Sequence, residues 1–189
     1  LYLVHGHVYV DRFIWPRMWK ICSELDAYGL YVALSGLELA TGKLIYTLLK
    51  RQLLVSVVTR QAEDGGWSHG EWTDLMESHY RFHNGAMLLL EAALKEHPDK
   101  VVSKSLQQAA QFISRCTDNT DLGLWFLHDS LEESTETMKA LCEQTGSTWI
   151  PARTFGKSPT NKLILNTHLD SIVTLEQYRN VSGDNQYEE

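Results

Sequence analysis

The sequence is poor in cysteine, lacks a basic stretch and lacks a long apolar run, and each shortage argues against a class of protein. The three cysteines lie far apart and form no Cys-x-x-Cys pair, which argues against a thiolate zinc site. A net charge of -7 without clustered lysine or arginine argues against a nucleic-acid partner. No apolar run approaches the roughly 20 residues that span a bilayer. We therefore expect a soluble globular protein, cytoplasmic or secreted, with no membrane span.

What the chain does have is helical periodicity in segments separated by glycine or proline. The pattern predicts helices over about residues 23–40, 43–60, 77–95, 100–116, 132–143 and 161–181. Residues 1–10 read as a strand, 118–123 as a turn and 124–129 as a short strand. We expect a single mainly α domain over residues 1–189, with an extended lead-in over 1–20 and antiparallel helical hairpins over 21–189.

The stretch from Asp64 to His83 holds most of the candidate chemistry. It contains three of the eight histidines and two of the six tryptophans, together with carboxylates, an arginine and a tyrosine. A loop that only joins two helices has no need of so many ionisable groups, so this composition indicates a binding or catalytic site. The structural alternative is a long surface loop whose tryptophans pack on neighbouring helices.

Histidine spacing in this stretch raises the question of a metal. On a helix that starts near Glu77, His79 and His83 lie one turn apart on one face, which suits a metal ion. The familiar His-Glu-x-x-His pattern has a glutamate after its first histidine, whereas Tyr80 holds that place here. We expect neither a metal site nor a cofactor.

Three segments resemble known families. Residues 37–42, Leu-Glu-Leu-Ala-Thr-Gly, resemble the hairpin turns of the (α/α) toroid (six-hairpin) carbohydrate-active enzymes. Residues 61–67 look like the Gln-x-x-Asp-Gly-x-Trp turn of several toroids. Residues 163–184 are similar to the Leu-Asn … Leu-x-x-Tyr … Gly-Asp segment in the C-terminal domain of glucuronyl C5-epimerases, although the segment after Trp125 differs from theirs.

The resemblance implies a partial (α/α) toroid that acts on a carbohydrate substrate. About three hairpins are present and both ends look cut, so we expect a piece of a longer protein in which further chain or a partner completes the ring. Hairpin rings bring alternate loops to one rim. We therefore expect the 64–83 loop to form one wall of a pocket, with Trp125 or His128 across from it and Asn166 or His168 nearby.

The first functional hypothesis is proton abstraction from a uronate sugar, by an epimerase or a lyase. This reaction needs a base, an acid and a cation that stabilises the developing enolate. Our candidates for catalysis are His69, Glu71, Asp74, His79 and Tyr80. Our candidates for substrate binding are Arg81, His83, Trp67, Trp72, Trp125, His128, Asn166 and His168.

Two other hypotheses stay open. A glycoside hydrolase needs a pair of carboxylates, and the candidates are Glu71, Asp74, Glu77, Asp129, Glu132 and Glu133. The third hypothesis is a helical-hairpin interaction module without catalysis. The tryptophans serve as sugar-stacking faces under the first two hypotheses and as core residues under the third.

Overall fold

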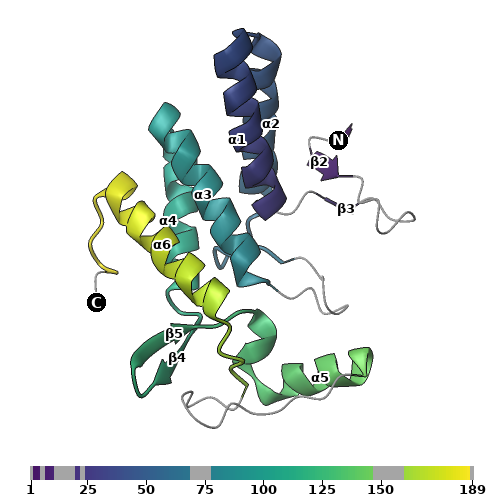
Figure 1. Ribbon diagram of the computed structural model, residues 1–189, viewed down its shortest axis with the longest axis vertical. Helices are drawn as coiled ribbons and strands as arrows, with labels where there is room; N and C mark the ends of the chain where they lie inside the picture. The colour runs from purple at the N-terminus through teal and green to yellow at the C-terminus, as the bar shows by residue number, and fades with distance from the viewer. Residues whose placement is uncertain are drawn as a thin grey trace.

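The computed structural model describes residues 2–4, 7–10, 20–21, 24–68, 78–146 and 160–187. The fold is mainly helical, as predicted, and its helices form hairpins (Figure 1). The six helices of this part are α1 (Glu24–Thr41), α2 (Leu44–Arg60), α3 (Tyr80–Glu96), α4 (Lys100–Ile113), α5 (Thr135–Thr145) and α6 (Leu165–Ser182). None of them combines the length and apolar character needed to cross a membrane. Closure of such hairpins into a toroid stays a prediction.

The strands are short, as expected, but the strand predicted over residues 1–10 is two strands, and the strands at 20–21 and 117–120 were not predicted. At the start of the chain, β1 (Tyr2–Val4), β2 (His7–Val10) and β3 (Lys20–Ile21) form an antiparallel sheet in that order. Further on, β4 (Thr117–Thr120) pairs with β5 (Gly123–Phe126). The turn predicted over 118–123 is therefore wrong, since most of it belongs to the ladder and only residues 121–122 turn.

Side-chain caps set several helix ends. The side chain of Asp99 accepts hydrogen bonds from the backbone N–H groups of Val101 and Val102 and starts α4. Ser134 caps α5 in the same way, so α5 begins three residues later than predicted, after the 3-10 helix η1 (Ser130–Glu133). The helix predicted from Glu77 begins instead at Tyr80, with His79 in the capping position.

Helix α3 is the centre of the core. It packs against α1 on one side and α6 on the other, and α4 packs on both α3 and α6 (Figure 1). Its Ala86, Met87, Leu89 and Leu90 are fully buried. They meet Leu53 and Val57 of α2 and Leu106 and Ala109 of α4 in one apolar cluster.

The Gly-Gly-Trp motif is a structural turn that fastens the end of α2 to α4. The Gln61 side chain donates to the carbonyl oxygens of Gly65 and Ser105, both at 2.9 Å, and accepts from the Ser105 hydroxyl. The indole N–H of Trp67 donates to the Val57 carbonyl. Gly65 has φ +96°, and a Cβ atom there would lie 2.3 Å from the carbonyl oxygen of Gln108, so only glycine fits.

Helix α6 has an inverted polarity. Three of its five buried residues are polar, namely Thr167, Ser171 and Thr174, and the other two, Leu175 and Tyr178, belong to the apolar core. Its large apolar residues Leu165, Leu169, Ile172 and Val173 are exposed. Leu44, Ile45, Leu48 and Val55 of α2 are exposed as well. Within the described part of the chain, both helices thus leave an apolar face uncovered.

Candidate active site

The start of α3 and the segment after β5 lie side by side. The backbone N–H of Tyr80 donates to the carbonyl of His128 at 3.0 Å, and that of Ser130 donates to the carbonyl of Ser78 at 2.9 Å. His79 and Asp129 form the bridge between these two hydrogen bonds. Two segments that are about fifty residues apart in sequence are therefore fixed in one register.

Three segments bring histidines and hydroxyls together at this place. The rings of His79 and His128 meet edge to face, with their centroids 4.3 Å apart. The ring of His79 also stacks on Phe82 at 4.6 Å. The His128 ring has a second partner, because its Nδ1 atom is hydrogen-bonded to the Thr167 hydroxyl of α6 at 2.6 Å. The start of α3, the β5–η1 segment and the start of α6 thus hold His128 from both sides.

A cavity of about 240 Å³ lies against His128. Its wall is formed by His128, Asp129, Leu131, Leu141, Lys162 and Ile164. The lining therefore combines a histidine, an aspartate and a lysine, and the rest of it is apolar. Asp129 already caps η1, because its Oδ1 atom accepts the backbone N–H of Leu131 at 2.8 Å.

Burial moves the pKa values of two groups here in opposite directions. Burial, helped by the positive charges of Lys162 and Arg81, lowers the pKa of His128 to about 4, so its imidazole is neutral at pH 7. Burial raises the pKa of Glu132 to about 7, although the His128 N–H that donates to its carboxylate at 3.1 Å works against this rise. At pH 7 the His128 imidazole is therefore neutral and lies beside a carboxyl group that titrates near neutrality.

Arg81 lies close to this cluster but lines a different groove. Its Nε donates to Oδ2 of Asp170 at 3.0 Å, and both side chains are about half exposed. The groove has a volume of about 300 Å³ and lies between α1, α3 and α6. Asn84 on its wall donates to the Ser171 hydroxyl of α6. The guanidinium has further N–H groups beyond the one that binds Asp170.

The structure pairs Trp125 with His168, both expected near the pocket. Their rings are stacked, with centroids 4.2 Å apart and planes 5° apart. Nδ1 of His168 accepts the backbone N–H of Phe126, and burial lowers the pKa of His168. Asn166, on the first turn of α6, is exposed, and its side chain accepts the N–H of Thr167.

Three candidate residues lie in the core and line neither of these two cavities. They are Trp67, Tyr80 and His83. The Tyr80 hydroxyl donates to a Glu133 carboxylate, and burial raises its pKa far above the usual value. Nε2 of His83 is hydrogen-bonded to the carbonyl of Ala109 at 2.9 Å. The other four candidates, His69, Glu71, Trp72 and Asp74, lie outside the described residues.

Lys162, Thr167 and Asp170 are residues that sequence reasoning missed. Each lies within or just before α6, and each becomes relevant only through a contact with a distant segment. We expected Asn166 and His168 near the rim because they lie near the start of the last predicted helix. Thr167 and Asp170 lie on the same helix. Nothing in the local sequence distinguishes Lys162 from other surface lysines.

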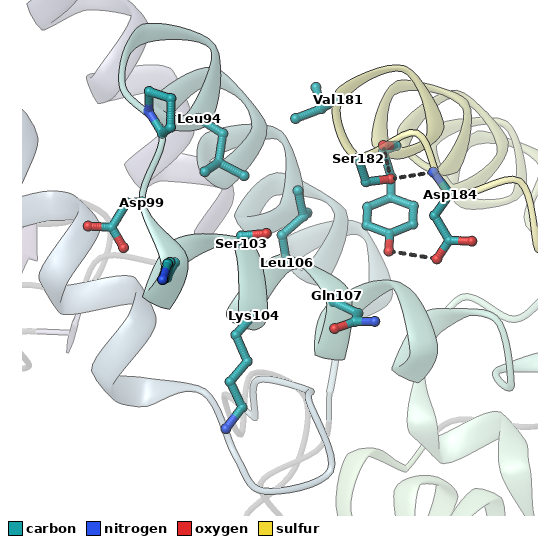
Figure 2. Close-up of a pocket in the computed structure, with 12 residues that line it drawn as sticks. Leu94, Asp99, Ser103, Lys104, Leu106, Gln107, Val181, Ser182 and Asp184 are labelled. Atoms are coloured by element: carbon teal, nitrogen blue, oxygen red, sulfur yellow. Dashed lines mark hydrogen bonds between the residues drawn. The ribbon is translucent and has the colours of Figure 1, made fainter.

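A larger cavity of about 780 Å³ lies between α4 and α6, away from the histidines. Figure 2 shows Lys104 and Gln107 on α4, and Ser182 and Asp184 at the end of α6. The Tyr178 hydroxyl donates to Asp184 at 3.0 Å. None of the described residues that line this cavity is a histidine. Among the residues that the structure describes, no group of three or more His, Cys, Asp or Glu is arranged to hold a metal ion.

Compared with known proteins, the chain matches no family model, no curated protein and no solved structure. The resemblance to toroid enzymes and to glucuronyl C5-epimerases therefore stays a prediction.

Proposed function

We propose that this protein is a carbohydrate-active enzyme that abstracts the C5 proton of a uronate residue, as an epimerase or a lyase. One observation carries the proposal: neutral His128, held between His79 and Thr167, faces a small cavity that Lys162 also lines. A neutral imidazole is a base, and an ammonium in the same space neutralises a carboxylate.

The chemistry follows from these groups. Lys162 binds the uronate carboxylate and thereby acidifies the neighbouring C5–H bond. His128 takes the proton, and the electron pair of that bond moves into the carboxylate to form an enolate, which Lys162 stabilises. Return of a proton from water to the opposite face of C5, with release of the His128 proton to water, inverts the centre. Loss of the group at C4, with the His128 proton delivered to the leaving oxygen, gives an unsaturated sugar instead.

The neighbouring groups fit supporting roles. Glu132 accepts the backbone N–H of His128 and so positions the base without lining the cavity. The cavity volume of about 240 Å³ is small for a ligand site, so it suits one sugar unit, and the Arg81 groove suits an adjacent unit of the polymer. The Trp125–His168 stack stiffens the segment that leads to His128.

The hydrolase alternative stays open. Asp129 is the single carboxylate among the described residues that line the His128 cavity, and it already serves as a helix cap. The candidates Glu71, Asp74 and Glu77 lie outside the described residues. A retaining or inverting hydrolase needs two carboxylates facing one bond. The interaction-module alternative is favoured by one observation, the exposed apolar face of α6.

The test is C5 hydrogen exchange. The intact protein is incubated in D₂O with a panel of uronate-containing and neutral polysaccharides, and deuterium at C5 is read by NMR while unsaturated product is read by ultraviolet absorbance. We expect exchange or elimination on a uronate polymer, and a loss of about 10²–10⁴-fold for His128→Asn.

The matched control is His97→Asn, because His97 is exposed at the opposite end of α3. It should keep full activity. Hydrolysis of a neutral polysaccharide with no C5 exchange on any uronate polymer would replace this proposal with the hydrolase reading. Full activity of a folded His128→Asn variant would remove His128 as the base.

A further inference from the structure

A second cluster of buried charge lies at the other end of α3. Lys50 of α2 is only 5% exposed. Its Nζ lies 2.6 Å from Oε2 of Glu38 on α1 and 2.6 Å from Oε2 of Glu96 on α3. The ammonium also sits over the ring of Tyr31, 5.1 Å from its centroid. One cation therefore joins two carboxylates from two different hairpins.

The contacts of Lys50 and Glu38 favour the charged form of both groups. Burial by itself lowers the pKa of Lys50, but the hydrogen bonds to Glu38 and Glu96 outweigh burial and raise it. The hydrogen bond from Lys50, followed by that from the Thr47 hydroxyl, lowers the pKa of Glu38. Two carboxylates and one ammonium leave one negative charge at this place.

A cavity of about 640 Å³ opens beside the cluster, within the size range of small-molecule sites. Part of its wall is apolar, formed by Leu54, Val55, Ala93, Pro98 and Val102. The rest is polar and includes the three charged residues of the cluster, Arg51, His97 and Asp99. The Glu38 and Glu96 side chains are 30% and 36% exposed, so their carboxylates are accessible from outside.

We propose that this cavity binds a small organic monocation, an amine or a guanidinium with a short hydrocarbon body. Its lining carries three carboxylates against one ammonium and one guanidinium, which leaves one negative charge for a cation to match. A carboxylate oxygen accepts more than one hydrogen bond, so Glu38 and Glu96 retain acceptor capacity towards the ligand.

The apolar wall of the cavity would recognise the hydrocarbon body of the ligand. A hydrocarbon body placed on Leu54, Val55 and Val102 removes apolar surface from water on both sides. A bare metal ion gains nothing from such a wall, and the described residues contain no group of three metal-ligating side chains. The same charge cluster also ties α1 and α2 to α3, so the first test uses the unaltered protein.

That test compares hexylamine, hexanoate and hexanol, which share one hydrocarbon body and differ in charge. Binding to the full chain is measured by isothermal titration calorimetry at physiological salt. We expect saturable binding of hexylamine with a dissociation constant of roughly 1 mM, and at least about tenfold weaker binding of the other two. Equal binding of hexanoate or hexanol, or no saturable binding of hexylamine, overturns the proposal.

Variants then locate the site. Glu96→Gln keeps the side-chain shape and removes one negative charge, so hexylamine should bind about tenfold more weakly. Glu143→Gln, an exposed change on α5, should bind as the unaltered protein does. If Glu96→Gln does not fold, Arg51→Gln serves instead: it removes a positive charge from the wall and should tighten hexylamine binding several-fold. A folded Glu96→Gln or Arg51→Gln variant with unchanged affinity overturns the assignment.

Discussion

Glu91 is a carboxyl group in the middle of the central helix. It is 1% exposed, and neither of its oxygens has a hydrogen-bond partner among the described residues. Burial therefore raises its pKa to about 8, against a small opposing effect from Lys95. A buried carboxyl group in this state is tolerated because it stays protonated, and it becomes costly only when it must ionise.

The first prediction concerns this residue. The folded-state pKa of Glu91 is about 8, above the ordinary value of 4.5. The contribution of protonated Glu91 to the free energy of unfolding is therefore fully present below about pH 4.5 and is lost as the pH rises through 8. The loss amounts to roughly 5 kcal/mol at most. Glu91→Gln cannot ionise, so urea denaturation should show that it matches the unaltered protein at pH 5 and is more stable at pH 9. Parallel pH profiles of the two proteins would contradict this.

The second prediction concerns Tyr80. Its hydroxyl is buried and donates to Glu133, so Tyr80→Phe keeps the ring in the core and leaves that carboxylate without this donor. We expect the free energy of unfolding to fall by about 1–3 kcal/mol. Turnover per folded molecule should stay unchanged under the proposed mechanism, because Tyr80 does not line the His128 cavity. A folded Tyr80→Phe variant with normal stability but little turnover would assign the hydroxyl a chemical role.

At the scale of elements, the turn after α2 is the least replaceable connection. Gly65 combines a positive φ with a carbonyl oxygen that a Cβ atom would meet at 2.3 Å. Gly123, between β4 and β5, also has a positive φ, but nothing lies within 4 Å of its Cβ position. Comparing alanine substitutions at the two glycines therefore separates the cost of backbone strain from the cost of a steric clash.

This contrast gives the third prediction. Gly123→Ala should cost about 1–3 kcal/mol, since only the backbone conformation is unfavourable. Gly65→Ala should cost more than about 3 kcal/mol, because α4 must move away from the turn as well. Chemical denaturation of both variants measures the difference. Equal losses would mean that the contact between the turn and α4 is looser than the structure shows.

The sequence predicts the helices better than the site. Periodicity with Gly42 and Pro98 as breaks locates the two hairpins to within a few residues, because these signals are local. The pairing of His79 with Asp129, and the contact of His128 with Thr167, join residues that are far apart in sequence. No local pattern encodes such contacts.

Burial of Tyr80 and His83 was also beyond the sequence, whereas packing of the tryptophans was an alternative that it offered. His83 bonds a carbonyl 26 residues away, and Tyr80 bonds a carboxylate 53 residues away. When the distant partner of a histidine or tyrosine is unknown, the sequence suggests an exposed site residue rather than a buried one. The expectation that hairpin loops meet at one rim rested on closure of a toroid, and that closure stays a prediction.

At the scale of the molecule, the uncovered faces of α2 and α6 are the main feature. Eight large apolar side chains from these two helices are exposed: Leu44, Ile45, Leu48, Val55, Leu165, Leu169, Ile172 and Val173. Contiguous exposed apolar surface favours association. The fourth prediction is that this chain by itself self-associates, as seen by sedimentation velocity at increasing concentration.

Two changes on α6 test which face is responsible. Leu169→Lys together with Ile172→Lys should reduce the self-association, because both side chains are about half exposed and the helix can keep its fold. Lys104→Glu on α4 serves as a control that changes charge without touching either face. A concentration-independent monomer in the unaltered protein would contradict the prediction.

The inverted polarity of α6 has a consequence for how the molecule opens. This helix is held by the polar contacts Asn84–Ser171, His128–Thr167 and Arg81–Asp170, and by Leu175 and Tyr178, which lie in the apolar core. The steepness with which urea promotes an unfolding step depends on the surface newly exposed. Release of α6 exposes less surface than unfolding of the whole chain, so it should depend less steeply on urea. Native-state hydrogen exchange should show its amides exchanging through a local opening with a shallow urea dependence, whereas those of α3 should exchange only when the whole chain unfolds.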